Sequence, residues 1–365
     1  MEKALHGMIN NSLQKRISYH DYMESVLYSP TLGYYMREKE KIGKNGDFYT
    51  SGNIGDSFGR TLARWFVFLI KERGLPPNVV EMGAGTGKLA YDIIGYIKEE
   101  EPLLWEEFTY ILVESSPYHN KLQQKRLSPC KQVVLAADLE ECPLINGILF
   151  SNELFDALPV HIIEKEKGEL LEIFITIKED KLTEIKEPLE NPHILSYLEE
   201  HNIILNEHQR YEIPLKMIKE YERMTHHLQS GLLLTIDYGY TEAEWKEPAH
   251  RLGSLRAFSQ HTLVNEVLER PGEMDLTTHI HFDTLIKLGN NNNLTLKGLL
   301  GQNDFLLKGG ILEELKNHEE TDPFSEPAKH NRAIRSLIMP GGHSQYFRVL
   351  LQTKNLDEKV TLFRK

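Results

Sequence analysis

Short and almost uninterrupted apolar runs recur along the chain, and helical or loop segments separate most of them. The runs lie at residues 79–82, 109–113, 132–136, 147–151 and 231–236, with later ones near 294–299 and 346–353. Apolar strands that alternate with helices are typical of a mostly parallel sheet that is covered on both faces. The pattern therefore predicts an α/β fold.

The alternation stops between residues 160 and 230. The stretch HIIEKEKGELLEIFITIKEDKLTEI, which begins at residue 161, predicts two or three antiparallel strands joined by tight turns. Helices are expected after it, near 193–201 and 215–229. We interpret this region as an α+β lobe inserted between two strands of the main sheet.

A helical extension is expected before the first apolar run. Residues 22–28 have helical spacing, and residues 56–73 predict a helix with an apolar face. The segment 33–59 is rich in glycine and aromatic residues, which excludes a long regular element. The expected domains are therefore an N-terminal extension with a covering loop at 1–75, a main domain at 76–159 and 231–365, and the inserted lobe at 160–230.

Composition excludes several classes of protein. The 365 residues carry a formal net charge of −12, which argues against a broad basic surface for nucleic acid. Two cysteines are too few for a disulfide framework or a four-sulfur zinc site. No run approaches the roughly 20 apolar residues of a membrane helix, and the first residues resemble no targeting signal. We expect a cytoplasmic protein without membrane insertion, and the sequence leaves a homodimer open.

The stretch VVEMGAGTGKLA, residues 79–90, predicts a strand, a glycine loop and the start of a helix. Such a loop brings backbone N–H groups close to a ligand. A phosphate-binding P-loop is excluded because Met82 and Leu89 replace its first glycine and its final hydroxyl residue. The relaxed dinucleotide pattern, Gly85-x-Gly87-x-x-Ala90, is satisfied, so the glycines alone do not select the ligand.

Acidic residues near this loop favour a different ligand. Four successive strands are followed or ended by acids, namely Glu81, Glu114, Asp138 and Glu153. Ligands of open α/β sheets bind at the carboxyl ends of the strands, where a carboxylate would repel a pyrophosphate. S-adenosylmethionine instead offers an ammonium, a sulfonium, a ribose diol and an adenine amino group.

The expected contacts pair Glu81 with the ammonium end, Glu114 with the ribose diol, and Asp138 and Leu139 with adenine. Each acid also has a structural alternative, because carboxylates at strand ends often cap the helix that follows. A nicotinamide dinucleotide stays a weaker alternative, since its phosphates would have to tolerate Glu81.

Several motifs together resemble the MidA family of S-adenosylmethionine-dependent methyltransferases, from about residue 22 to residue 352. They are GDFYTS (46–51), VVEMGAGTGKLA (79–90), VESSP (113–117), NELFDALPV (152–160), IDYGY (236–240), GSLRA (253–257) and PGEMDLTTH (271–279). NELFDALPV and DLTTH in this order are the most specific. The resemblance implies the class I methyltransferase fold, Rossmann-like with a seven-stranded and mostly parallel sheet, a helical N-terminal extension and an inserted lobe.

The resemblance also implies a cofactor site and a substrate class. The candidate cofactor ligands, beyond those already named, are Thr50, Ser51, Gly83, Gly85, Gly87, Ser115 and Asn152. Thr50 and Ser51 could bind the methionine carboxylate or only stabilise a turn. The family includes a mitochondrial complex I assembly factor that dimethylates an arginine, which implies a protein substrate. Two departures from the family pattern, Gly52-Asn53 and His281, put the acceptor side in doubt.

Four residues are candidates for catalysis. A carboxylate can hold a guanidinium bidentately, and Glu153 and Asp156 could do so together if their segment begins a helical turn. Alternatively, Asp156 and Asn152 only shape that turn. Asp275 and His279 are spaced for one helical face, and His279 could accept a proton near neutral pH. His279 and His281 lack further ligands at useful spacing, so we predict no metal.

Three functions remain open at this point. The leading prediction is methylation of an arginine in a partner protein. The same cofactor site could instead serve methylation of a small molecule or of another residue type. The third alternative is an assembly factor that acts by binding a partner, with S-adenosylmethionine in a structural or regulatory role.

Overall fold

The structure is a computed structural model that describes residues 1–39, 41, 55–127, 130–260, 262–264, 266–317, 322, 325–339, 346–357 and 359–364. The chain divides into two compact units. Unit 1 contains the described parts of 1–48, 155–221 and 239–288, and unit 2 contains those of 49–154, 222–238 and 289–365. None of the helices in these described ranges is both long and apolar enough to cross a membrane.

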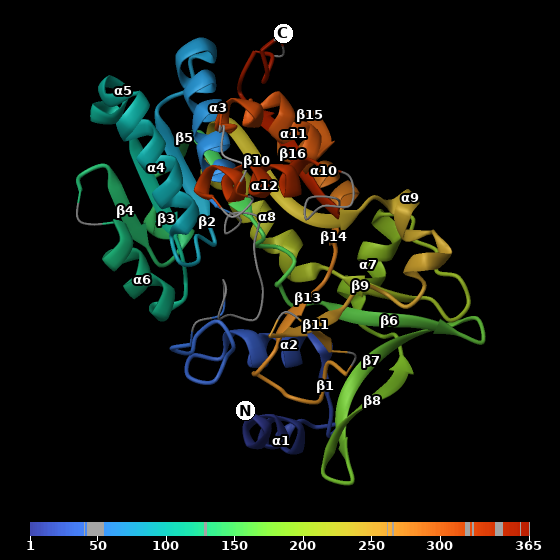
Figure 1. Cartoon of the computed structure of the whole chain (residues 1–365). Coiled ribbons are helices and arrows are strands. Elements are labelled where there is room, and N and C mark those ends of the chain that lie inside the picture. The colour runs from blue at the N-terminus through green and yellow to red at the C-terminus, as the bar shows by residue number, and fades with distance from the viewer. Residues whose placement is uncertain are drawn as a thin grey trace. The chain divides into compact units, whose positions relative to one another are not determined.

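Within the described ranges, the main sheet has eight strands, and seven of them form the centre of unit 2 in the order β15-β16-β10-β5-β2-β3-β4 (Figure 1). The eighth, β14 (Ile280–His281), pairs in parallel with the last residues of β10. The strands are β2 (Asn78–Met82), β3 (Thr109–Val113), β4 (Val133–Ala136), β5 (Ile145–Asn152), β10 (Leu228–Tyr240), β15 (Leu294–Gly301) and β16 (Phe347–Lys354). Neighbours from β4 to β10 pair in parallel, and β16 pairs antiparallel with both β10 and β15. The predicted class I methyltransferase fold is confirmed.

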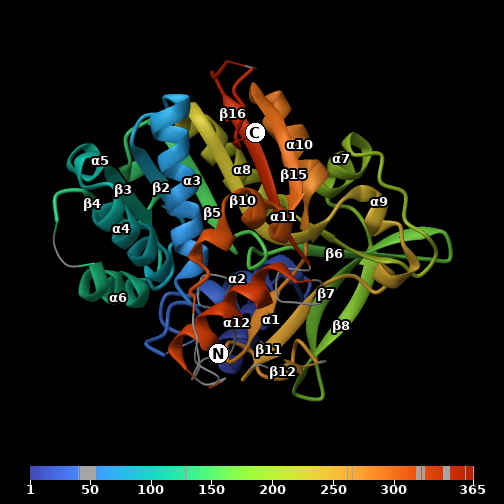
Figure 2. The same cartoon turned by 45° about the horizontal axis from the view of Figure 1, so that its top comes forward.

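Helices α3 and α4 lie along the strands of this sheet, as Figure 2 shows. One apolar core joins their side chains to those of β2, β3, β5, β10 and β16, and to residues of α11 and α12. The helical segments of unit 2 are α3 (Ser57–Arg73), α4 (Lys88–Glu100), α5 (Pro102–Glu107), α6 (Pro117–Leu127), η2 (Leu139–Glu141), α11 (Gln302–Lys308), η4 (Ile311–Glu314) and α12 (Glu326–Ile338). Helices α8 (Leu215–His227) and α10 (Phe282–Asn291) each cross a boundary between the units.

Unit 1 is built on an antiparallel sheet of five strands in the described ranges. Strand β7 (Glu169–Lys178) pairs with β6 (His161–Glu166), β8 (Lys181–Pro188) and β1 (Ile17–Ser18). Strand β6 also pairs with β9 (Arg210–Ile213). The predicted antiparallel strands of the lobe are therefore present. The other elements of unit 1 are α1 (Glu2–Asn11), α2 (Tyr19–Tyr28), α7 (Pro192–Glu200), α9 (Glu242–Trp245), η3 (Pro248–His250), β11 (Arg256–Ser259), β12 (Thr262–Val264), β13 (Asp275–Thr277) and β14 (Ile280–His281).

The units differ from the predicted domain boundaries. The first two helices were expected to form a separate extension, yet their apolar residues share one core with the lobe and with β13. Tyr22 and Val26 of α2, for example, belong to the same cluster as Ile173 of β7 and Leu276 of β13. Segment 239–288, which was assigned to the main domain, also belongs to unit 1. These associations join residues far apart in sequence, so local patterns do not report them.

Two glycines allow β5 and β10 to come together at their beginnings. Gly147 and Gly231 are partners in the parallel register, with φ angles of +145° and +136°. A Cβ atom added to Gly231 would lie 1.8 Å from the carbonyl oxygen of Gly147. L-amino acids with side chains rarely adopt such φ values, so both steric contact and backbone conformation require glycine at residue 231.

We predict that Gly231→Ala lowers the free energy of unfolding by about 3 kcal/mol or more, because the strands must separate or the backbone must change. Chemical denaturation of both proteins measures the difference. Gly95→Ala is a matched control, since nothing lies within 4 Å of a Cβ at that site in α4. The control should be neutral or stabilising by about 0.5–1 kcal/mol. An equal response of the two variants would contradict this explanation.

Candidate active site

The glycine loop joins β2 to α4 and is held against the end of β3. Gly83, Gly85 and Gly87 all have positive φ angles, of +68°, +51° and +70°. The N–H groups of Gly83 and Ala84 donate to the carbonyl oxygen of Val113, at 2.9 and 3.2 Å. A Cβ atom on Gly83 would lie 2.7 Å from Leu154. Glycine is therefore favoured by the left-handed backbone, and at residue 83 the tip of the Leu154 side chain would also have to move for a larger residue.

Glu114, directly after β3, connects this loop to the neighbouring one. One carboxylate oxygen accepts the N–H of Gly85 at 2.8 Å, and the other accepts the N–H of Ser116 at 2.7 Å. Each oxygen of an ionised carboxylate has two lone-pair sites, so both oxygens can accept one further hydrogen bond. A vicinal diol such as ribose would supply two donors, and the acceptors that Glu114 presents at this loop therefore fit the predicted cofactor.

Helix α6 supports the glycine loop through two polar side chains. The amide of Gln123 donates to the carbonyl oxygen of Gly85 at 2.8 Å. The guanidinium of Arg126 donates to the carbonyl and the hydroxyl oxygens of Thr86, both at 2.8 Å. The sequence analysis missed both residues, because they follow the loop by about 40 positions and carry no motif. They fix two loop carbonyl oxygens and so hold the backbone of the loop in place.

Glu81 was expected to carry a negative charge at the ligand site, but its side chain is buried. Its side chain is only 3% exposed and accepts a hydrogen bond of 2.7 Å from the Tyr110 hydroxyl. Burial raises the pKa of Glu81 to about 8; the bond from Tyr110 acts in the opposite direction, and the charge of Glu114 raises the pKa further. Glu81 is therefore mostly protonated at pH 7. The argument that its charge would repel a pyrophosphate is wrong for this state, and its contact with an ammonium group stays a prediction.

Asp138 caps the short helix η2, which is the structural alternative to contact with a ligand. Its carboxylate accepts the N–H of Glu140 at the start of η2, and it is also paired with the guanidinium of Arg223. Leu139 is buried and Ser115 is exposed. The roles of Asp138 and Leu139 at adenine and of Ser115 at the cofactor stay predictions.

Asn152 ends β5, and Glu153 follows it in a left-handed conformation with φ of +54°. The N–H of Glu153 donates to the carbonyl oxygen of Ile236 on β10, and the Asn152 amide donates to the Glu153 carboxylate at 3.2 Å. The helical turn that was expected to pair Glu153 with Asp156 is absent at these described residues. A positive φ costs a residue with a side chain about 1 kcal/mol, which the bond to β10 offsets.

Unit 1 brings two predicted acceptor residues, Asp156 and Asp275, to one tyrosine. The Tyr35 hydroxyl donates to Asp275 at 2.6 Å, and burial, followed by the charges of Asp275 and Asp156 among others, raises the pKa of Tyr35 well above its usual value. The carbonyl oxygen of Asp156 accepts the N–H of Thr278 at 2.8 Å. Segments that are more than 100 residues apart thus place two buried carboxylates near the same hydroxyl.

His279 does not have its predicted properties. Asp275 lies in β13 and His279 follows that strand, so no helical face joins them. The His279 ring stacks on Tyr240 with ring centres 4.5 Å apart. Burial, followed by the nearby Arg256 and His250, lowers the pKa of His279 to about 4. His279 is therefore uncharged and only weakly basic at neutral pH, and its catalytic role stays a prediction.

His281, where the family commonly has aspartate, is a packed residue of unit 1. Its ring stacks on Trp245 with ring centres 4.8 Å apart, and its Nδ1 is 3.0 Å from the Tyr211 hydroxyl. Burial is the main reason that the pKa of His281 falls to about 3. In this chain His281 therefore packs β14 against α9.

Glu212 joins two of the sequence motifs in the folded chain. Its buried carboxylate accepts the N–H groups of Ser254 and Leu255 from the GSLRA segment, at 2.8 and 3.1 Å. The Ser254 hydroxyl oxygen accepts the N–H of His279 at the end of the DLTTH segment, at 3.0 Å. The sequence analysis missed Glu212, because no local pattern distinguishes it from an exposed glutamate of a strand. It connects β9 to both motifs.

Two predicted cofactor residues, Thr50 and Ser51, lie outside the described residues, as do Gly52 and Asn53. Their predicted roles are unchanged.

Comparison with known proteins identifies the family. The profile of a family described as S-adenosyl-L-methionine-dependent methyltransferases matches residues 61–300 of this chain. The chain belongs to this family. S-adenosylmethionine is therefore its cofactor, in agreement with the glycine loop and the accepting capacity of Glu114.

Related proteins extend over most of the chain. The protein arginine methyltransferase NDUFAF7 of Danio rerio mitochondria is 27% identical over 373 residues, which cover 92% of this chain and 83% of the relative. The Homo sapiens protein of the same name is 26% identical, with 94% and 78% covered. A crystal structure from Burkholderia thailandensis, bound to S-adenosyl-homocysteine, superposes with a TM-score of 0.88 at 25% identity and covers 100% of this chain and 94% of that one.

The buried Glu81 predicts an unusual dependence of stability on pH. Its pKa is about 8 in the folded protein, against an ordinary value of 4.5, so the unfolded chain releases this proton first as the pH rises. Stability is therefore lost between about pH 4.5 and 8. We expect Glu81→Gln to raise the free energy of unfolding on the order of 3 kcal/mol at pH 7 and to have little effect near pH 4.5.

Thermal unfolding from pH 4.5 to 8 measures this difference. Glu107→Gln is a suitable control, because Glu107 is an exposed glutamate at the end of α5. Parallel pH profiles for the wild type and Glu81→Gln would show that Glu81 is ionised in the folded protein.

Proposed function

We propose that this methyltransferase acts on an arginine side chain of a protein. The observation that carries the proposal is the similarity to curated protein arginine methyltransferases over more than nine-tenths of the chain, for two of the relatives compared. The paired carboxylates of unit 1 support it, because a guanidinium is a planar cation with several N–H donors.

Arginine methylation makes two demands on the acceptor site. A guanidinium is a poor nucleophile, since its lone pairs are delocalised and its pKa is about 13.8. The protein must therefore fix one nitrogen in line with the reactive methyl and exclude water. In the proposed mechanism Asp156 and Asp275 accept hydrogen bonds from the guanidinium and orient it. Tyr35 holds the Asp275 carboxylate through its 2.6 Å bond.

The cofactor side is assigned to unit 2. Bound S-adenosylmethionine supplies a methyl group that is activated by the positive charge on sulfur. The glycine loop allows the cofactor to approach the backbone closely, Glu114 provides the acceptors for a diol, and Gln123 and Arg126 keep the loop in place. Glu153 and Asn152 at the end of β5 remain candidates for contact with the acceptor and the cofactor, respectively.

We expect Asp156→Asn and Asp275→Asn each to lower kcat about 100-fold or more, with little change in the affinity for S-adenosylmethionine. The physical reason is that an amide presents N–H groups to the N–H groups of guanidinium. The assay incubates each variant with tritium-labelled cofactor and protein extract from cells that lack this gene. Acid hydrolysis and chromatography then identify the labelled amino acid.

Glu273→Gln serves as the control, because Glu273 is exposed and only two residues before Asp275. We predict that wild-type protein and the control place the label in methylarginine, and that both aspartate variants lose this label. Label in another amino acid or in a small molecule would contradict the proposed substrate.

A further inference from the structure

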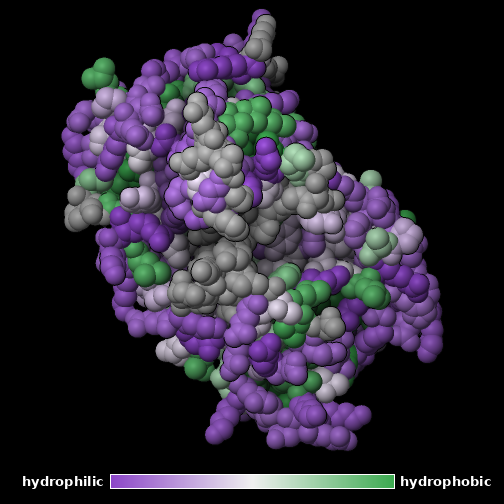
Figure 3. All heavy atoms as spheres, in the orientation of Figure 1, coloured by the Kyte–Doolittle hydropathy of each residue, from purple (hydrophilic) through white to green (hydrophobic). Residues whose placement is uncertain are grey.

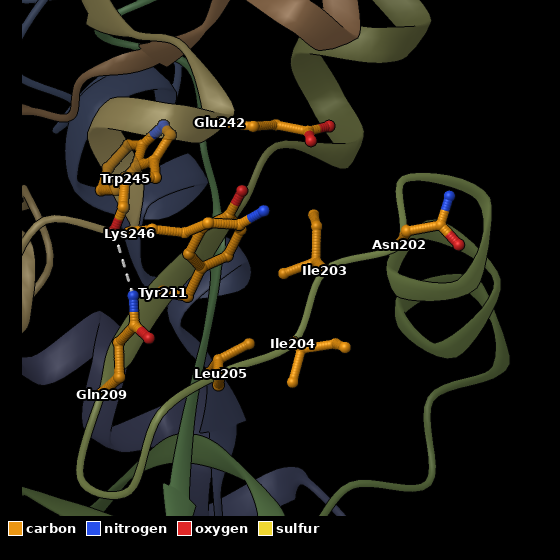
Figure 4. Close-up of a pocket in the computed structure, with 9 residues that line it drawn as sticks. All are labelled: Asn202, Ile203, Ile204, Leu205, Gln209, Tyr211, Glu242, Trp245 and Lys246. Carbon is orange, nitrogen blue, oxygen red and sulfur yellow. Dashed lines mark hydrogen bonds between the residues drawn. The ribbon is translucent and has the colours of Figure 1, made fainter.

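The pocket of unit 1 that Figure 4 shows is too small for a substrate group. Its lining comes from the loop after α7, from Gln209 and Tyr211 at β9, and from α9 with Lys246. The free space is about 20 Å³. About 10–15 Å³ is enough for one water molecule, so the pocket has room for solvent but not for a side chain of a partner.

Helix α6 of unit 2, in contrast, is polar on both of its faces. Its buried residues are His119, Gln123 and Leu127, and two of these three are polar. Figure 3 shows mainly hydrophilic groups over the region that Figure 1 labels α6. A surface helix usually packs through an apolar stripe. Polar contacts therefore take a large part in holding α6 against its neighbours.

These polar contacts go to the two loops of the cofactor site. Gln123 and Arg126 donate to carbonyl oxygens of the glycine loop. The Asn120 amide donates to the carbonyl oxygen of Glu114 at 2.9 Å. The inner face of α6 is therefore fitted to the glycine loop and to the residue that offers acceptors to a diol.

His119 faces the side chain of Glu114 from the same helix. Its Nδ1 lies 3.6 Å from Oε2 of Glu114, the oxygen that also accepts the N–H of Gly85. Both side chains are buried, with 5% of the His119 side chain and 10% of the Glu114 side chain exposed. The distance is longer than a hydrogen bond, so the contact is electrostatic. Because a carboxylate only accepts, the contact is favourable when Nδ1 carries a proton.

Glu114 needs donors around it because a carboxylate loses its hydration when it is buried. The N–H groups of Gly85 and Ser116 replace part of this hydration, one at each oxygen. They leave the orientation of the carboxylate dependent on two bonds that lie in mobile-type turns rather than in a strand or helix. His119 adds a third contact from a helix, on the side of Gly85, and so restrains the carboxylate further.

We propose that His119 is a positioning residue for the cofactor, which holds the Glu114 carboxylate in the orientation that receives the ribose diol. If His119 only packed α6 against the main sheet, its loss would weaken every ligand of the site equally. Positioning through Glu114 instead affects only ligands that carry the diol. The inference rests on the contact between Glu114 and ribose that belongs to the proposed function, and it is independent of the methyl acceptor.

The test measures binding of S-adenosylhomocysteine and of its 2′,3′-dideoxy analogue by isothermal titration calorimetry. We expect wild-type protein to bind S-adenosylhomocysteine about tenfold or more tightly than the analogue, because the diol donates to Glu114. His119→Leu should weaken S-adenosylhomocysteine about 5- to 10-fold and change the affinity for the analogue less than about twofold. Unchanged binding of the analogue also shows that the variant is folded.

Two further variants complete the test. His119→Asn keeps an N–H donor close to the place of Nδ1, so its affinity for S-adenosylhomocysteine should stay within about threefold of the wild type. Gln124→Leu is the matched control, because Gln124 lies on the exposed face of α6. It should bind both ligands as the wild type does.

Equal weakening of both ligands in His119→Leu, no weakening of either, or the same loss in His119→Asn as in His119→Leu would each overturn the positioning role. In these cases the preference of the wild type for the diol would still support the contact between Glu114 and ribose. Equal affinity of wild-type protein for the two ligands would overturn that contact and the role of His119 together.

Discussion

The hydrogen bond from Gly85 N–H to the Glu114 carboxylate is the contact on which the cofactor site depends. The parallel register of β2 and β3 brings the two strand ends together, and Glu114 then joins the loops that follow them. His119 lies beside this carboxylate, with Nδ1 3.6 Å from one oxygen, and the remaining lone-pair sites of Glu114 can accept from a diol. Gln123 and Arg126 act on the other side of the loop, by binding its carbonyl oxygens. A loop with three left-handed glycines would otherwise be free to adopt many conformations.

Most elements of the fold could be predicted from the sequence. The apolar runs mark strands because buried parallel strands need apolar side chains on both faces, and all seven predicted runs of the main sheet are strands. The division into units could not be predicted in the same way. The core that unites α2 with β7 and β13 depends on contacts between segments that are separated by more than 100 residues, and local periodicity carries no information about them.

The chemistry of several candidate residues could not be predicted from the sequence. Position in sequence indicates that Glu81 lies near a strand end, but it does not report burial, and it wrongly placed Asp275 and His279 on one helical face. Burial leaves Glu81 mostly protonated at neutral pH and His279 uncharged, so two arguments based on ordinary pKa values were wrong. The supporting residues Gln123 and Glu212 were missed for a related reason, because their importance lies in partners that are distant in the chain.

The central claim is that the glycine loop and Glu114 bind S-adenosylmethionine, and isothermal titration calorimetry tests it most directly. We expect S-adenosylmethionine to bind wild-type protein with one site, and Glu114→Gln to weaken binding on the order of 10- to 100-fold, because the loss of two accepting sites costs about 1–3 kcal/mol. NAD should show no heat of binding. Binding of NAD, or no binding of S-adenosylmethionine at millimolar concentration, would contradict the account.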